Sequence, residues 1–215
     1  MSSASRPTKQ PAETAEAEEG VRAFHQIDAG TGREQSGYTL RGAGDGQYLL
    51  EVSGLASGDW LPSLCERLFA EQINILRGHG RREDDGSVAG AFVLDPTSVR
   101  TQVFDIEFMA CLQGRKPPGT PYSISVSNYA VNPSTRFGSS IRLDLEGLDR
   151  PGFLRTFLQH LEPLELEARK VQISTVNRAV RDRFWLTATE GSDLPGKIND
   201  LMELLESLME CYWAR

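Results

Sequence analysis

One internal repeat constrains the fold of this chain more than any other feature of its sequence. A shift of 93 positions places residues 50–75 on residues 143–168 without a gap, so that Leu50 coincides with Leu143 and Gly54 with Gly147. Further apolar residues coincide at the same shift: Leu55 with Leu148, Trp60 with Phe153, Leu61 with Leu154, Leu68 with Leu161, and Phe92 and Val93 with Trp185 and Leu186. A period of this length predicts two similar domains and not a solenoid of short units.

Both copies have the same order of expected elements. An alternating strand comes first, followed by a Gly-Leu pair, a polar corner and a short amphipathic helix. The helical stripe consists of Leu61, Leu64, Cys65 and Leu68 in the first copy and of Leu154, Phe157, Leu158 and Leu161 in the second. Two β-rich segments follow in each copy, joined by "EDDG" in the first and by a turn near Asn177 in the second.

A final helix closes each copy. The second has an apolar stripe that runs from Ile198 to Tyr212, and Pro195 lies in its first turn. The first is predicted over about residues 98–113, although the alternation of "FDIEF" there would also suit a strand. The resulting βαββα unit places two helices on one face of an antiparallel sheet. The predicted fold class is therefore α+β, with two ferredoxin-like domains.

A complete ferredoxin-like unit needs a fourth strand. We expect residues 121–131 to supply it for the first copy, and we interpret the glycine-rich residues 42–46 as a flexible connector. Only "CYWAR" remains after the second copy, which is too short for a strand. Either "VRAFHQID" near the N-terminus crosses over to close the second sheet, or a partner chain does, or an edge stays open.

The expected organisation has three parts. Residues 1–20 are rich in Ala, Glu, Ser and Pro and lack aromatic residues, which is typical of a disordered tail. Residues 21–120 form the first expected domain with an N-terminal extension. Residues 121–215 form the second.

The corner between the first strand and the first helix of the second copy carries the most specific motif. It consists of Asp149, Arg150, Pro151 and Gly152, and the apolar pair Phe153 and Leu154 follows it. The first copy departs from this pattern, because Ala56, Ser57, Gly58 and Asp59 occupy the equivalent positions.

This repeated βαββα unit with its Asp-x-Pro-Gly corner resembles the ACT domain, a small regulatory module that binds amino acids. The resemblance covers roughly residues 47–113 and 139–212, and a stand-alone pair is similar in architecture to the glycine cleavage system repressors. It implies domains that associate side by side, with ligands at the interface contacted by the corner. The ligand-binding residues that it implies are Asp149, Arg150, Gly152, Phe153 and Leu154.

The chemistry of the corner suits such a ligand. The amides at the N-terminus of the helix that starts near Phe153 could hold a carboxylate, Asp149 could pair with an ammonium group, and Gly152 allows close backbone approach. The alternative is purely structural: Asp149 caps the helix, Pro151 sets its first turn and Gly152 relieves strain. The sequence leaves both interpretations open.

Composition argues against several other classes of protein. A net charge of −7 disfavours a broad basic surface for nucleic acid, and no apolar run has the roughly 18–20 residues that cross a membrane. The chain also lacks an apolar signal-peptide core, so we expect it in the cytoplasm. Three dispersed cysteines and three dispersed histidines form no metal-ligand or catalytic pattern, so we expect no metal, no cofactor and no enzymatic activity.

Two groups of basic residues have no such pattern either, and we expect them to face solvent. They are Arg77, His79, Arg81 and Arg82 on the first hairpin, and Arg169, Lys170, Arg178, Arg181 and Arg183 on the second. The alternative for the second group is that it attracts an acidic partner or a small anion.

Together these features predict a regulatory protein that senses an amino acid or similar small metabolite at a domain interface. We expect it to form a homodimer and a partner protein to respond to the bound state. The alternative is a ligand-free assembly module, in which the paired sheets only join proteins together.

Overall fold

A single nine-stranded antiparallel sheet organises the molecule. The computed structural model describes residues 21–27, 34–97, 102–114, 122–189 and 193–213, so the expected tail over residues 1–20 lies outside the described residues. The strands are β1 (Val21–Ile27), β2 (Glu34–Gly44), β3 (Gln47–Leu55), β4 (Ile73–Arg82), β5 (Ser87–Pro96), β6 (Val126–Ser134), β7 (Ser140–Leu148), β8 (Leu166–Val176) and β9 (Ala179–Ala188). The α-helices are α1 (Trp60–Ala70), α2 (Phe108–Leu112), α3 (Phe153–Leu161) and α4 (Leu194–Trp213).

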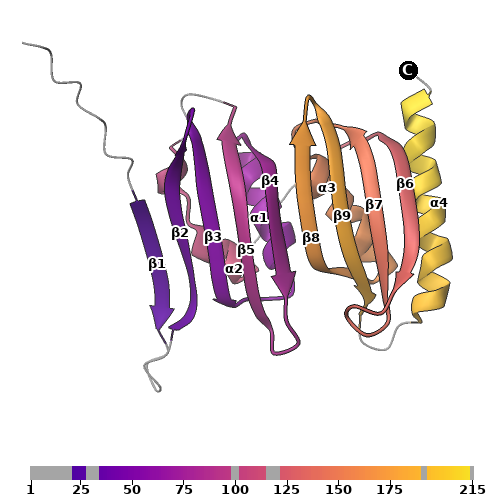
Figure 1. The fold of residues 1–215 in the computed structure, drawn as a ribbon, viewed down its shortest axis with the longest axis horizontal. Helices are drawn as coiled ribbons and strands as arrows, with labels where there is room; N and C mark the ends of the chain where they lie inside the picture. The colour runs from indigo at the N-terminus through magenta and orange to yellow at the C-terminus, as the bar shows by residue number, and fades with distance from the viewer. Residues whose placement is uncertain (1–20, 28–33, 98–101, 115–121, 190–192, 214–215) are drawn as a thin grey trace, which may run out of the picture.

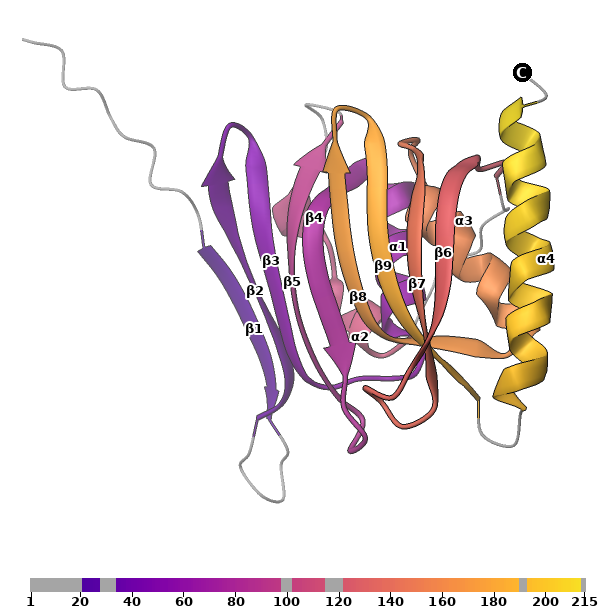
Figure 2. The same cartoon turned by 45° about the vertical axis from the view of Figure 1, so that its right-hand side comes forward.

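The strand order is β1-β2-β3-β5-β4-β8-β9-β7-β6. Strands of the first half (residues 21–114) thus occupy one side of the sheet and strands of the second half (residues 122–213) the other, with β4 and β8 paired between them. Helices α1, α2 and α3 lie on one face, while α4 runs beside β6 at the edge (Figure 1, Figure 2). The α+β class, the antiparallel sheet and the placement of helices α1 and α3 on one face agree with the sequence prediction.

A pseudo-twofold axis passes between the two central strands. The register pairs Arg77 with Ser174, Gly78 with Ile173, His79 with Gln172, Gly80 with Val171 and Arg81 with Lys170. His79 and Gln172 are related by the 93-residue shift found in the sequence, so the axis lies between them. Helices α1 and α3 also lie against each other across this axis. The strand order is thus symmetric about the β4–β8 pair, with β2-β3-β5-β4 on one side and β8-β9-β7-β6 on the other.

Alternating side chains explain why each strand has one face in the core. On β7, Ile141, Leu143 and Leu145 are buried and point toward the helices, while the residues between them are half-buried. On α3, Phe157 is fully buried and its ring packs against that of Phe184 on β9, with 5.0 Å between centroids. The helical stripe predicted for the second copy is thus the face that covers the sheet.

The prediction for the fourth strands was wrong, and the correction completes both halves. β2 pairs with β3, and β6 pairs with β7, so each half receives its outer strand from the residues that precede its repeat. Residues 126–134 therefore belong to the second sheet half and not to the first, and "VRAFHQI" pairs with β2 at the opposite end. The turns that join β2 to β3 and β6 to β7 are shorter than the crossover connections that we expected. Closing a shorter loop loses less chain entropy.

The turn between β2 and β3 shows why the glycine-rich stretch was misinterpreted. Gly44, Asp45 and Gly46 all have positive φ angles, of 80°, 52° and 75°. An Asp-Gly pair favours such left-handed conformations and is a strong hairpin signal. The stretch is therefore a tight turn and not a flexible connector.

One part of the repeat alignment is displaced by a residue. Phe92 on β5 pairs with Leu50, whereas its structural equivalent beside Leu143 is Phe184 and not Trp185. The cause is the connection between the paired strands: the β4–β5 turn is one residue longer than the β8–β9 turn, because Arg82 pairs with Val88 while Thr175 pairs with Val180. Beyond this turn the equivalent positions are 92 residues apart.

The final helices differ between the halves. Helix α4 confirms the second prediction: it begins at Leu194, so that Pro195 lies in its first turn, and Leu201, Leu205 and Leu208 of the predicted stripe are buried. The helix predicted over residues 98–113 is wrong in length. Among the described residues only a 3₁₀ turn, Val103–Asp105, and the five-residue α2 are helical there.

Candidate functional site

All five residues singled out from the sequence line one cavity between the two halves of the chain. We call it the Asp149 cavity; its volume is about 50 Å³. The second half contributes the corner, the start of α3 and parts of β8 and β9, and the first half contributes the end of α1 and the start of β4. The residues that it shares with the prediction are Asp149, Arg150, Gly152, Phe153 and Leu154.

Backbone geometry fixes the corner at residues 149–152. The amide of Asp149 donates to the carbonyl of Arg178 at 2.8 Å, which ties the corner to the β8–β9 turn. Gly152 is the N-cap of α3 with φ 81°, a left-handed conformation that glycine adopts without steric cost. A Cβ at this position would lie 2.8 Å from Cδ2 of Phe69, so a side chain is excluded by contact as well. Asp149 makes no side-chain cap at this helix, which removes one structural role proposed for it.

Two carboxylates line the Asp149 cavity. The Asp149 carboxyl is partly buried, and this desolvation raises its pKa. Asp182 on β9 is only 3% exposed, and desolvation, together with the nearby charge of Asp149, raises its pKa to about 7. A hydrogen bond from the backbone amide of Ser174 to Oδ1 of Asp182, at 3.2 Å, acts in the opposite direction. Arg150 and Arg155 supply positive charge to the same cavity.

Arg155 also joins α3 to α1 through a buried ion pair. Its Nε donates to Oε2 of Glu66, and the side chains of Arg155 and Glu66 are 2% and 5% exposed. Nε2 of Gln159 donates to the same oxygen at 3.3 Å. The Arg155 guanidinium lies over the rings of Phe69 and Tyr122, 4.8 and 5.5 Å from their centroids. One wall of the cavity is thus held by contacts between the halves.

The position related to the Asp149 cavity by this pseudo-twofold axis holds a second cavity, which is lined by different residue types. This Asp59 cavity has a volume of about 280 Å³ and is lined by the first-half corner together with the end of α3 and the start of β8. Asp59 takes the place of Gly152, Arg82 that of Thr175, and Glu162 that of Phe69. The sequence predicted that the two corners differ, and the structure shows that they line cavities of different size and charge.

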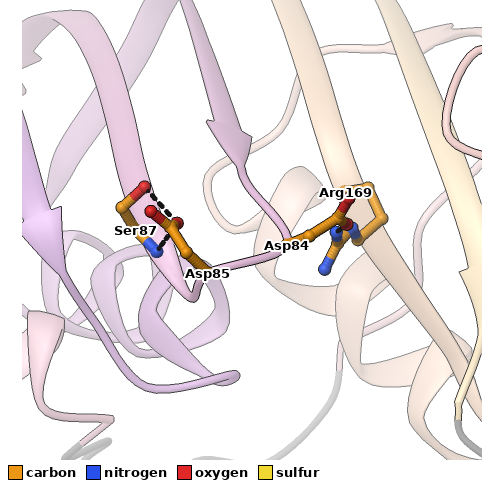
Figure 3. Close-up of polar contacts among 4 residues, drawn as sticks. All are labelled: Asp84, Asp85, Ser87 and Arg169. Atoms are coloured by element: carbon orange, nitrogen blue, oxygen red, sulfur yellow. Dashed lines mark hydrogen bonds and ion pairs between the residues drawn. The ribbon is translucent and has the colours of Figure 1, made fainter.

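The basic residues predicted to face solvent do so for the most part. Arg77, His79, Arg81, Arg178, Arg181 and Arg183 are exposed. Arg82 and Lys170 depart from the prediction because both are half-buried; Arg82 lines the Asp59 cavity, and Nζ of Lys170 lies over the Trp185 ring. Arg169 on β8 is half-buried and forms an ion pair with Asp84 in the β4–β5 turn, so it links the two halves (Figure 3). Asp85 in that turn accepts hydrogen bonds from the backbone amide and hydroxyl of Ser87, at 2.9 and 2.6 Å.

Two cysteines are described with their side chains, and both lie in the core. Cys65 and Cys111 are free and buried, and burial raises the pKa of the Cys65 thiol far above its ordinary value and that of Cys111 to about 11. Within the described ranges, no three His, Cys, Asp or Glu side chains are grouped so that they could hold a metal ion. None of the helices described is both long enough and apolar enough to cross a membrane.

Sequence reasoning missed Asp182 and the first-half wall of the cavity. A signal for Asp182 was present, because it alternates with Val180 and Phe184 on the buried face of β9, where a carboxylate is unexpected. Phe69 and Ile75 reach the cavity only because β4 pairs with β8, and nothing in a single sequence predicted that pairing.

Comparison with known proteins adds one distant structural likeness. No family model and no curated protein matches the sequence. A crystal structure of aspartate kinase from Synechocystis is similar over 76% of this chain, with a TM-score of 0.43 and 16% sequence identity. The similarity covers 28% of the kinase chain, so this chain spans little more than a quarter of that protein's length.

Proposed function

We propose that the chain is a non-enzymatic regulatory protein whose two halves are ACT-type domains, and that it senses a small amino acid or similar metabolite in the Asp149 cavity. The resemblance of the Asp-x-Pro-Gly corner to the ACT family, stated above on Asp149 to Leu154, supports the class of ligand. The proposal places the protein in the cytoplasm, where a partner protein would respond to the ligand-bound form.

One observation carries this proposal: a ligand in the Asp149 cavity would touch both halves. The corner and Asp182 belong to the second half, whereas Phe69 and Ile75 belong to the first. A ligand that contacts both sides of an interface binds with different affinity to different arrangements of the two sides. It therefore shifts the population toward the arrangement that it fits best.

The charges in the cavity match the two charged groups of an amino acid. The N-terminus of α3, a nine-residue helix, and the Arg150 guanidinium would attract the carboxylate. Asp149 would attract the ammonium group. A volume of about 50 Å³ accommodates about three to five water-sized groups, since each needs roughly 10–15 Å³. Glycine comes nearest to this size, so the cavity favours the smallest amino acids.

A thermal-shift screen of the purified protein against all twenty amino acids tests the proposal. A ligand that binds the folded state must raise the melting temperature as its concentration passes the Kd. We expect saturable stabilisation by a small amino acid, loss of the effect in Asp149→Ala, and no loss in Asp59→Ala, which alters the other cavity. If no amino acid stabilises the protein at millimolar concentration, the sensor function is refuted.

A second candidate function is a ligand-free assembly module, favoured by the position of β1. Among the described strands it is the last in the sheet on its side, and none of them pairs with its outer row of backbone groups, which a further strand could therefore bind. A homodimer joined through β1 would extend the sheet across two chains. Sedimentation velocity distinguishes the candidates: assembly predicts a concentration-dependent dimer that no amino acid affects and that deletion of residues 21–27 abolishes.

A further inference from the structure

Asp182 is a buried carboxylate without a cation partner in the described structure. Its backbone lies on β9 opposite Leu145 of β7, and its side chain is on the helix-covered face between those of Val180 and Phe184. It is 3% exposed, and the contact given for its carboxylate is the hydrogen bond from the Ser174 amide. Among the ion pairs between described residues, none includes Asp182, although it lines the Asp149 cavity. An ionised carboxylate that is buried in this way raises the free energy of the folded state unless a positive charge or hydrogen bonds compensate it.

The fold itself does not require this carboxylate. Pairing of Val52 with Gly90 and of Leu145 with Asp182 makes Gly90 the equivalent of Asp182 in the first half. The equivalent of Asp149 is Ala56. The first half therefore forms the same strands and the same corner with neither acid, so both acids are specific to the Asp149 cavity.

We propose that the Asp149 cavity selects ligands that carry a primary ammonium group, which binds between the carboxylates of Asp149 and Asp182, and that binding is in competition with a proton on Asp182. This inference rests on the proposed sensor function and adds to it the group that is recognised and a dependence on pH.

The neighbouring titratable and charged side chains explain why Asp182 would be the group that loses a proton when the ammonium binds. The titratable and charged side chains that line the cavity with Asp182 are Cys65 on α1, Asp149 and Arg150 at the corner, and Arg155 on α3, while β8 contributes Ile173 and Thr175. The Cys65 thiol is neutral because burial raises its pKa. Arg155 is engaged with Glu66. Asp149 raises the pKa of Asp182 and therefore favours its protonated form in the empty cavity.

The consequence is a defined pH dependence of affinity. With a pKa of about 7, Asp182 is mostly protonated at pH 6 and mostly ionised at pH 8. The α-ammonium group of an amino acid stays charged across this range. Because the ammonium binds the ionised form, the apparent affinity should fall about tenfold from pH 8 to pH 6, in proportion to the ionised fraction. Because Asp182 is about half protonated near pH 7, binding there should release on average about half a proton per ligand to the buffer.

Isothermal titration calorimetry with the full chain tests the inference, using the twenty amino acids, N-acetylglycine and methylammonium as probes at pH 6, 7 and 8. We expect the amino acid that binds best to lose about tenfold in affinity from pH 8 to pH 6, and N-acetylglycine not to bind. Asp182→Asn should weaken binding at pH 8 by at least about tenfold and remove the pH dependence. Asp59→Asn, in the other cavity, is the matched control and should behave as the unaltered protein.

The outcomes distinguish a failure of the ammonium role from a failure of the proposed sensor function. If an amino acid binds but N-acetylglycine binds as tightly, or Asp182→Asn binds with unchanged affinity and pH profile, the ammonium role is refuted while the sensor function stands. If no probe binds to the unaltered protein at any pH, the sensor function and this inference are both refuted. Circular dichroism melts of Asp182→Asn and Asp59→Asn confirm that each variant is folded before its titration.

Discussion

Removing Arg155 should destabilise the protein more than any change at its surface. In Arg155→Met, the Glu66 carboxylate stays buried, 5% exposed, with the Gln159 amide at 3.3 Å as the remaining donor of the cluster. Breaking a buried pair by removing one partner costs about 3–5 kcal/mol, because the other charge stays desolvated. For a chain of this size, that loss corresponds to a decrease in Tm of roughly 6–20 °C.

Two further variants separate the charge from the packing. Glu66→Gln keeps an oxygen that can accept from Arg155, and the guanidinium keeps its contacts with Phe69 and Tyr122, so we expect a smaller loss than in Arg155→Met. The double variant Glu66→Leu with Arg155→Met replaces both charges by apolar groups. It should recover most of the stability lost in Arg155→Met, since such replacements are often neutral or stabilising.

Urea unfolding followed by circular dichroism of the unaltered protein, Glu66→Leu, Arg155→Met and the double variant measures the complete double-mutant cycle. The pair joins α1 of the first half to α3 of the second, so Arg155→Met should also broaden the transition or split it in two. A loss below about 1 kcal/mol in Arg155→Met would refute the reasoning, because it would mean that water reaches Glu66. A double variant that is less stable than both single variants would refute it as well.

Three other predictions follow from the described contacts. Gly152→Ala should lower the free energy of unfolding by about 1–2 kcal/mol from its positive φ alone and by more because of Phe69, whereas Gly138→Ala, with φ 70° and open space around it, should show the backbone cost only. Chemical denaturation of both variants measures the difference, and equal losses would show that Phe69 moves away freely. Because the pKa of Asp182 is raised in the folded state, its carboxyl binds more protons in the folded protein than in the unfolded chain between about pH 4 and pH 7. The contribution of Asp182 to stability should therefore fall, by on the order of 4 kcal/mol, as pH rises through that window. Asp182→Asn should flatten this profile, and an unchanged profile in urea titrations at pH 4 to 8 would contradict the assignment. Cys65 and Cys111 should not react with Ellman's reagent in native Cys211→Ser protein at pH 8 and should both react in guanidinium; rapid native labelling would contradict their burial.

The repeat allowed much of the fold to be predicted because it compares the sequence with itself. Apolar positions such as Leu50 and Leu143 coincide since both face the same core, and this gave the order of strands and helices in each half. The comparison failed where length differs, at the β4–β5 turn, and where the chain outside the repeat takes part, at β2 and β6. The Asp45-Gly46 turn signal could have corrected the second error.

The candidate site could be predicted only in part, for a physical reason. The corner is local in sequence, and its residue types are unusual enough to identify Asp149 and Gly152. The opposite wall comes from α1 and β4, which lie there because of a strand pairing across the whole chain. Asp182 could have been identified by its place in the alternation of β9, where it is the one acid on the apolar face.

The pairing of β4 with β8 within one chain affects how the two related pockets can evolve. When two identical chains form a symmetric pair, every substitution appears twice, and the two related pockets must stay alike. Here both partners are encoded in a single polypeptide, so a substitution alters one pocket and leaves its counterpart as it was. Gly90 and Asp182 illustrate this freedom, because equivalent places on either side of the axis now carry no side chain and a carboxylate. Covalent linkage of the two halves thus permits one pocket to specialise while the other keeps a different shape.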